Sequence, residues 1–245
     1  MSDWTTFFAF PLNLLLACLW ATGWIMLWKK KNHGHLVRLM LSPAATISAL
    51  VLLLSVSLWM GFCGNDGITA SIPFALVLLY IQTVLLMVTL RGWKRPEGKI
   101  RWRFLLIHAG LLLTLGAGFW GEADSSEVRL KLNRGEITRE AYKPDGSTTI
   151  LPYKISLTDF KVENSEDGKP VHYEAYISLN EQAPVKITVN NPHSQRFGEE
   201  IYLASVSKTG CILQIVHEPW KYFALAGIIM LLTGAFMLFI KGPKK

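Results

Sequence analysis

The amino-acid sequence predicts a membrane protein: an α-helical bundle of about five transmembrane helices with an extracytoplasmic antiparallel β domain, a small sandwich or open barrel. Three observations lead to this fold class. Hydrophobic residues make up 51% of the 245 residues and charged residues only 18%, which departs from the composition of soluble domains. Five apolar stretches are long enough to cross a hydrocarbon core of about 30 Å. Between the fourth and the fifth stretch, short β-prone runs alternate with turn signals.

The five expected spans contain little or no charge. At a rise of about 1.5 Å per residue, even the shortest can approach the thickness of the hydrocarbon core. They divide the chain into a four-helix transmembrane region at residues 1–120, an outer β domain at residues 121–219, and a last helix with a basic cytoplasmic tail at residues 220–245. The expected spans are Phe7–Trp28, Leu39–Phe62, Ile72–Leu90, Phe104–Trp120 and Tyr222–Ile240.

Basic residues gather at one set of span ends. Residues 121–219 hold 11 basic and 15 acidic residues, so the net charge of +7 comes from the membrane part of the chain. This distribution favours orientation in a bilayer and excludes nucleic acid as the expected partner. The positive-inside rule predicts a multi-pass membrane protein with the N-terminus and residues 121–219 outside and the C-terminus cytoplasmic. In a Gram-negative bacterium the membrane would be the inner (cytoplasmic) membrane and residues 121–219 would be periplasmic. The basic clusters are Lys29–Lys31 with Arg38, Arg91–Arg103, and Lys241–Lys245.

The outer segment is expected to contain six or seven antiparallel strands. Its turns are indicated by Pro144–Gly146 and by Asn190–Pro192, because these residue types favour tight turns. About a hundred residues suffice for a modest core. The β-prone runs are Val128–Leu132, Ile137–Tyr142, Tyr153–Val162, Val171–Leu179, Val185–Asn190, Ile201–Val206 and Cys211–Val216.

His108 is the main candidate for a functional residue, because it lies inside the fourth span, about 7–8 Å beyond Arg103 by helix rise. An ionisable group at that depth usually faces the protein interior and has a partner. One reading is an interhelical hydrogen bond, for instance to Gln82 or Asn13. The other is an axial nitrogen for haem iron, since a neutral imidazole and a low dielectric suit a porphyrin. No second histidine lies within a span, so a second ligand would have to come from a partner chain.

The other histidines and the cysteines carry weaker signals. The histidines His33, His35, His172, His193 and His217 lack a spacing typical of a metal site and are expected to be surface residues. The three cysteines form no C-x-x-C motif, although Cys63 and Cys211 both fall on the expected outer side, where a disulfide is one alternative. Phosphate loops, nucleophile elbows and zinc-protease motifs are missing from the sequence. We therefore expect no catalysis by this chain alone and no metal beyond a haem iron.

The fourth span and the outer segment together resemble the ResB (CcsB) family of system II cytochrome c biogenesis. The resemblance runs from about Arg103 to Phe239, and its most specific part joins an Asn-Asn-Pro turn to a later Gly-Glu-Glu-Ile-Tyr stretch. The pieces that carry it, in order, are His108–Gly110, Leu151–Glu163, Tyr173–Leu179, Ile187–Pro192, Phe197–Tyr202 and Glu218–Trp220.

The resemblance implies a subunit of a haem export and attachment complex. Such a subunit works with a ResC/CcsA-type partner, a membrane protein with a tryptophan-rich WWD segment that this sequence lacks. Together they pass haem across the membrane to CxxCH apocytochromes. The implied cofactor is haem b, held transiently and shared with the partner, and the implied axial ligand is His108. Two alternatives stay open: a haem-b-binding anchor of a respiratory complex, and a structural membrane protein with an outer β domain.

Overall fold

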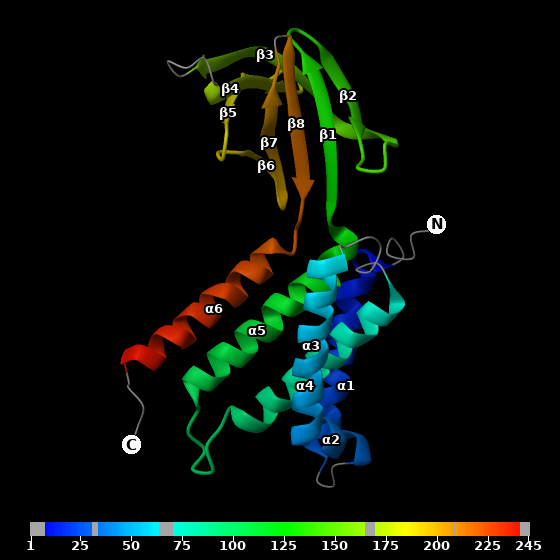
Figure 1. Cartoon of the computed structure of the whole chain (residues 1–245), viewed down its shortest axis with the longest axis vertical. Coiled ribbons are helices and arrows are strands. Elements are labelled where there is room, and N and C mark those ends of the chain that lie inside the picture. The colour runs from blue at the N-terminus through cyan, green and yellow to red at the C-terminus, as the bar shows by residue number, and fades with distance from the viewer. Residues whose placement is uncertain (1–7, 31–33, 64–70, 165–169, 208, 241–245) are drawn as a thin grey trace. The chain divides into compact units, whose positions relative to one another are not determined.

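The computed structural model describes residues 8–30, 34–63, 71–164, 170–207 and 209–240. The chain forms two compact units. Residues 1–123 with residues 220–245 make up a helical unit, and residues 124–219 make up a β unit (Figure 1). The expected basic tail and residues 1–7 lie outside the described residues, as does His33.

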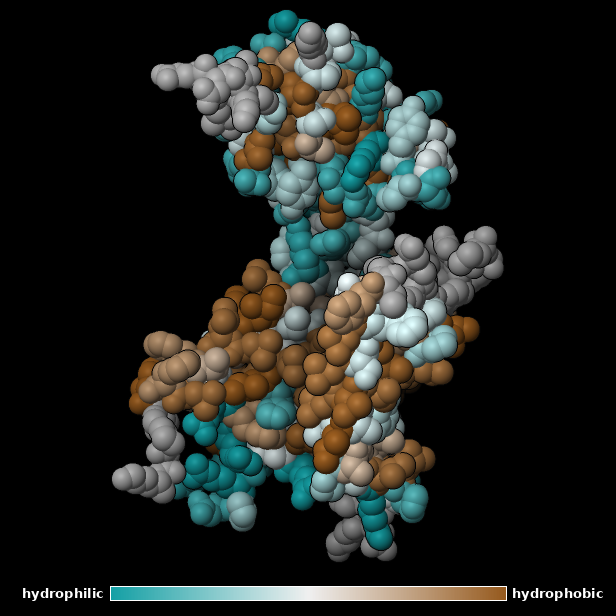
Figure 2. All heavy atoms as spheres, viewed as in Figure 1, coloured by the Kyte–Doolittle hydropathy of each residue, from teal (hydrophilic) through white to brown (hydrophobic). Residues whose placement is uncertain are grey.

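Within its described residues, the helical unit contains five helices that are long and apolar enough to cross a membrane. This confirms the expected number of spans. Figure 2 shows hydrophobic side chains over the outer surface of these helices, as expected where lipid replaces water. The long helices are α1 (Leu12–Lys29), α3 (Pro43–Cys63), α4 (Ile72–Gly92), α5 (Trp102–Gly121) and α6 (Lys221–Ile240), and α2 (His35–Met40) is a short helix.

The second span begins later than the sequence suggested. Leu39 was expected to start it, but Leu39 belongs to the short helix α2, and α3 begins at Pro43. The break has a local cause, because proline disfavours the helical conformation of the preceding residue while its missing N–H fits the first turn of a helix. The hydroxyl of Ser42 accepts a hydrogen bond from the backbone N–H of Ala45 (3.1 Å) and satisfies one of the free donors of α3.

Glycines let α5 and α6 approach closely. A Cβ on Gly227 would collide with the Thr114 hydroxyl and would lie 2.7 Å from the carbonyl oxygen of Gly110. A Cβ on Gly234 would lie 2.7 Å from the Ile107 side chain. In a bilayer, close backbone approach of this kind replaces the hydrophobic driving force that water would supply. The two helices therefore form a tight antiparallel pair.

The β unit is one antiparallel sheet with the strand order β5, β4, β3, β2, β1, β8, β7, β6. Its edge strands, β5 and β6, follow each other in sequence, and its first and last strands, β1 and β8, are neighbours in the sheet. The strands are β1 (Ser126–Asn133), β2 (Ile137–Tyr142), β3 (Thr148–Asn164), β4 (Pro170–Leu179), β5 (Val185–Thr188), β6 (His193–Arg196), β7 (Glu199–Val206) and β8 (Gly210–His217).

The sheet curls so that β4 and β5 approach β7, which makes it an open barrel. Alternate side chains point inward, as the pattern of Leu130 and Leu132 in β1 illustrates. A single core of buried side chains from seven strands fills the interior, among them Ile155, Ile177 and Leu213. The expected all-antiparallel β domain is therefore confirmed.

The sheet has eight strands rather than six or seven. The additional strand is β6, whose sequence His-Ser-Gln-Arg lacks the apolar alternation that marks a strand. β6 is held by main-chain pairing with β7, for example between His193 and Ile201. An edge strand needs no buried side chain, and hydropathy therefore gives no signal for it.

Candidate functional site

His108 lies in the second turn of α5, on the face of that helix turned toward α4. Phe104, one turn earlier, packs on Gly92 at the end of α4, and Leu115, two turns later, packs on the apolar cluster between α3 and α4. Residues spaced by four and seven positions share one side of a helix, so His108 lies on the same face as these two contacts. Its side chain is partly buried.

The imidazole of His108 is held by the backbone of its own helix. Its Nδ1 lies 2.9 Å from the carbonyl oxygen of Phe104. A carbonyl oxygen can only accept, so this hydrogen bond assigns the proton to Nδ1. In the neutral imidazole Nε2 then carries the lone pair, and no hydrogen-bond partner for Nε2 exists among the described residues. A fixed tautomer with a free nitrogen is the state that a metal-ligating histidine requires.

An aromatic contact fixes the plane of the imidazole as well. The Phe104 ring stacks on the imidazole with 3.8 Å between ring centroids and 22° between planes. The guanidinium carbon of Arg101 lies over the Phe104 ring, 4.8 Å from its centroid. Phe104 can occupy this position because residue 92 is glycine, where a Cβ would collide with the ring. Arg101, Phe104 and His108 therefore form a column along the first two turns of α5.

The interhelical hydrogen bond considered for His108 does not occur in the described structure. The amide nitrogen of Asn13 donates to the carbonyl oxygen of Trp120 (2.7 Å). Gln82 is 1% exposed, and neither its amide nitrogen nor its amide oxygen has a hydrogen-bond partner within the described residues. The expected partners are thus engaged elsewhere or unpaired, and the imidazole bonds only to its own helix.

The remaining described histidines do not assemble a metal site. His35 is exposed, and Nε2 of His172 lies 3.5 Å from the carboxylate of Glu174. Nδ1 of His217 is buried without a partner in the described part of the chain. No group of three or more potential metal ligands is found among the described residues.

Cys211 is buried in the core of the β unit as a free thiol, and burial raises the pKa of that thiol to about 11. The free thiol of Cys211 speaks against the Cys63–Cys211 disulfide considered from the sequence, although the side chain of Cys63 itself lies outside the described residues.

A buried polar network in the β unit escaped the sequence analysis. The Tyr153 hydroxyl donates to one carboxylate oxygen of Glu199 (2.7 Å), and Nη2 of Arg196 lies 2.7 Å from the other. Glu199 is only 3% exposed. Burial, followed by the hydrogen bond to Glu199, raises the pKa of Tyr153 well above its usual range. The available signal was the position of Glu199 two residues before Ile201, which puts it in phase with the inward residues of the following β-prone run, where an apolar residue is the rule.

The network joins three strands. Tyr153 lies in β3, Glu199 in β7 and Arg196 in β6, so the Tyr153–Glu199 bond connects the edge hairpin to β3, and the Arg196–Glu199 pair lies within the hairpin. Gly198, at the turn of this hairpin, has a positive φ of 76° and packs against the backbone of Pro219. The Gly-Glu-Glu-Ile-Tyr stretch thus has a structural role in the β unit.

Most of α5 and of the β unit falls within one region that matches a known protein family. The sequence model of the ResB-like family matches residues 99–212, which run from just before α5 into β8. The chain carries a ResB-like region. That region contains His108 and the Tyr153–Glu199 pair, and it agrees with the resemblance seen in the sequence.

The curated relatives are proteins named cytochrome c biogenesis protein CcsB from strains of Prochlorococcus marinus. One is 28% identical over 126 residues, which is 49% of this chain and 28% of the relative. Another is 28% identical over 119 residues, or 47% of this chain and 27% of the relative. The chain thus matches little more than a quarter of the length of these relatives. Among solved structures, the cytochrome c haem lyase CcmF is similar at 15% identity and a TM-score of 0.43, over 92% of this chain and 39% of CcmF.

Proposed function

We propose that this chain is a subunit of a system II cytochrome c biogenesis complex, in which it binds haem inside the membrane and helps to pass it outward. The receiving molecules would be CxxCH apocytochromes, and the partner would be a ResC/CcsA-type WWD membrane protein. The proposal is supported by the ResB-like region at residues 99–212 and by the names of the CcsB relatives. Haem is the cargo in this proposal.

The observation that carries the proposal is the state of His108. Its Nδ1–H is bonded to the Phe104 carbonyl and its Nε2 has no partner in the described chain, so a lone pair is available to a haem iron. An imidazole that is protonated, or hydrogen-bonded through both ring nitrogens, could not bind iron without first giving up a proton or a hydrogen bond. Phe104 adds an apolar surface beside the imidazole, which suits a porphyrin.

A single histidine fits a carrier better than a stable electron-transfer site. A low-spin b haem is typically held by two histidines from facing helices, and His108 is the one histidine in the described membrane-spanning helices. One nitrogen from this chain and one ligand from the partner would give reversible binding. Haem could then leave when the partner ligand moves.

The charge distribution supports one orientation of the chain in the membrane. The basic helix ends would face the cytoplasm of a bacterium, and the β unit would face outward, where apocytochromes receive haem. The chain would not be catalytic alone, because ligation chemistry would require the WWD partner. The β unit would position the partner or the apocytochrome.

The test is a visible spectrum of the chain purified with and without its partner, before and after dithionite. We expect a Soret band in wild type that is lost in His108→Ala and retained in His35→Ala, a control that removes an exposed histidine of α2. Circular dichroism checks that both variants fold. Equal haem content in wild type and His108→Ala would contradict the proposal. A low-spin b-type spectrum without the partner would favour the respiratory anchor, and no haem in any preparation would favour the structural protein.

A further inference from the structure

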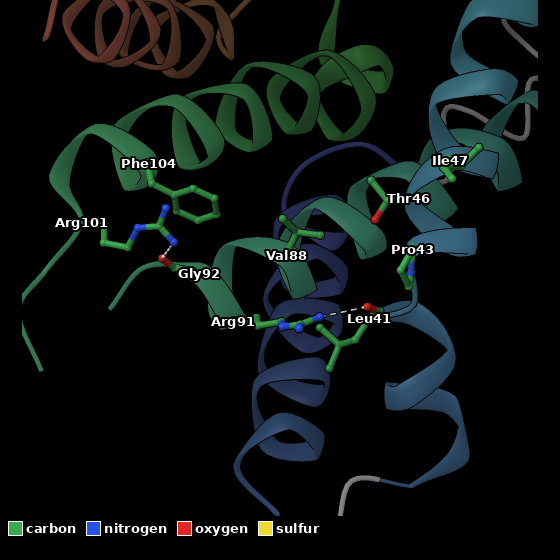
Figure 3. A pocket seen from close by; sticks show the side chains of 9 residues that line it. All are labelled: Leu41, Pro43, Thr46, Ile47, Val88, Arg91, Gly92, Arg101 and Phe104. Carbon is green, nitrogen blue, oxygen red and sulfur yellow. Dashed lines mark hydrogen bonds between the residues drawn. The ribbon is translucent and has the colours of Figure 1, made fainter. Parts of the chain in front are cut away.

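A pocket of about 490 Å³ opens at the basic ends of α3, α4 and α5. Figure 3 shows its lining: Thr46 and Ile47 from the start of α3, Arg91 from the end of α4, and Arg101 and Phe104 at the start of α5. Its walls are mostly apolar, and two arginines, Arg91 and Arg101, are among the lining residues. It lies at the level where the hydrocarbon core should give way to headgroups, because the helices that form it end there.

The two arginines are held in place without a counter-charge. Nη1 of Arg91 donates to the carbonyl oxygen of Leu41 (3.3 Å), and Nη1 of Arg101 donates to the carbonyl oxygen of Gly92 (3.3 Å). Each bond uses one of five guanidinium donors. No ion pair in the described part of the chain involves either arginine, although Glu97 lies in the loop between them. Both side chains keep donors free for an anion.

We infer that this pocket binds one anionic phospholipid, with the phosphate between Arg91 and Arg101 and an acyl chain along Ile47, Val88 and Phe104. A ligand at this depth must satisfy two positive charges and cover an apolar wall at the same time. An anionic phospholipid has both parts, and basic pockets between membrane helices are typical headgroup sites. A free phosphate would leave the apolar wall uncovered, and a neutral lipid would give the arginines less charge to bind.

The site is separate from the free nitrogen of His108. His108 does not line the pocket, and the two share only Phe104, which stacks on the imidazole and lines the pocket. Lipid binding is therefore expected to persist in His108→Ala. The inference can fail while the haem proposal holds, and the reverse is also true.

The test is native mass spectrometry of the full chain in a non-ionic detergent, titrated with phosphatidylglycerol or with phosphatidylcholine. We expect wild type to retain one phosphatidylglycerol at concentrations where phosphatidylcholine is lost. Arg91→Gln and Arg101→Gln should each weaken retention roughly tenfold, as expected for one charge-assisted hydrogen bond. Arg103→Gln is the matched control, since Arg103 is exposed near the same end of α5 and does not line the pocket.

A second variant tests the apolar wall without changing charge. Ile47→Trp should fill part of the pocket and weaken phosphatidylglycerol retention, and Ile47 is exposed enough that the substitution should not disturb the helix core. Equal retention of the two lipids, or equal loss in Arg103→Gln, would overturn the inference. Displacement of the lipid by millimolar inorganic phosphate would identify a free-anion site. Haemin bound through Arg91 and Arg101 with no phosphatidylglycerol retained would identify a porphyrin carboxylate site. Either result would overturn the assignment to a lipid.

Discussion

The Tyr153 hydroxyl donates a 2.7 Å hydrogen bond to the buried carboxylate of Glu199, across the interior of the β unit. The other carboxylate oxygen is paired with Arg196. Removing one partner of a buried charged acceptor costs more than the bond itself contributes, because the acceptor is left desolvated. Loss of either partner of Glu199 is therefore expected to destabilise the β unit.

Tyr153→Phe should destabilise the β unit by about 1–3 kcal/mol, because the phenyl ring fits while Glu199 loses its donor. The measurement is hydrogen exchange of the full chain by mass spectrometry, read on peptides from β3 and β7. Tyr142→Phe is the control, since Tyr142 is half exposed on β2. Equal exchange in the two variants would show that the Tyr153 bond contributes little.

The same pair predicts a loss of stability at high pH. Burial and the hydrogen bond to Glu199 raise the pKa of Tyr153 in the folded state above its ordinary value of 10.0. Above pH 10 the unfolded chain loses this proton and the folded chain keeps it, so stability falls as pH rises. Urea unfolding of wild type between pH 9 and pH 11 should show this decline. In Tyr153→Phe the decline should be shallower; an unchanged slope would assign it to other groups.

Glycine 227 should tolerate no side chain. Gly227→Val places a branched side chain against Thr114 and the Gly110 carbonyl, and should lower the stability of the α5 and α6 pair by about 1–3 kcal/mol. The check is thermal unfolding in detergent by size-exclusion chromatography. Gly118→Val is the matched control, because a Cβ on Gly118 meets no atom within 4 Å. If both variants melt alike, the close approach of α5 and α6 is not what stabilises the pair.

Cys211 should resist alkylation while the β unit is folded. Its thiol is 2% exposed and its pKa is raised to about 11 by burial, so little reactive thiolate exists at pH 8. Iodoacetamide labelling, followed by mass spectrometry of the β8 peptide, should be slow in native protein and fast in urea. A Ser205→Cys variant supplies an exposed thiol on the neighbouring strand as a positive control. Fast native labelling of Cys211 would mean that β8 opens readily.

The sequence predicts the features that depend on hydropathy and misses those that depend on backbone pairing. The five spans follow from the lengths of the apolar runs, and the alternation of residues such as Leu130 and Leu132 identifies most of the sheet. β6 could not be found this way, because main-chain pairing with β7 forms it without apolar side chains. Pro43 signals a helix boundary in the sequence, but the apolar run on both sides of it favoured one continuous span.

The candidate site shows the same division. His108 could be singled out from its place within an apolar span, since a polar ring there needs an explanation. The tautomer of His108 could not be predicted from the sequence, because the Nδ1 hydrogen bond depends on the rotamer that brings the ring to the Phe104 carbonyl. The Tyr153 and Glu199 pair also needed the fold, since 46 positions in sequence separate two residues that meet across the sheet.

The neighbouring positions of β1 and β8 determine when the β unit can be completed during synthesis. β1 is among the first parts of the unit to leave the ribosome, but Ser126 pairs with His217 at the far end of the same segment. Until β8 is made, one edge of β1 stays open to incorrect pairing. The sheet can close only as the last apolar helix begins to emerge, so closure of the sheet and emergence of α6 fall within the same short interval.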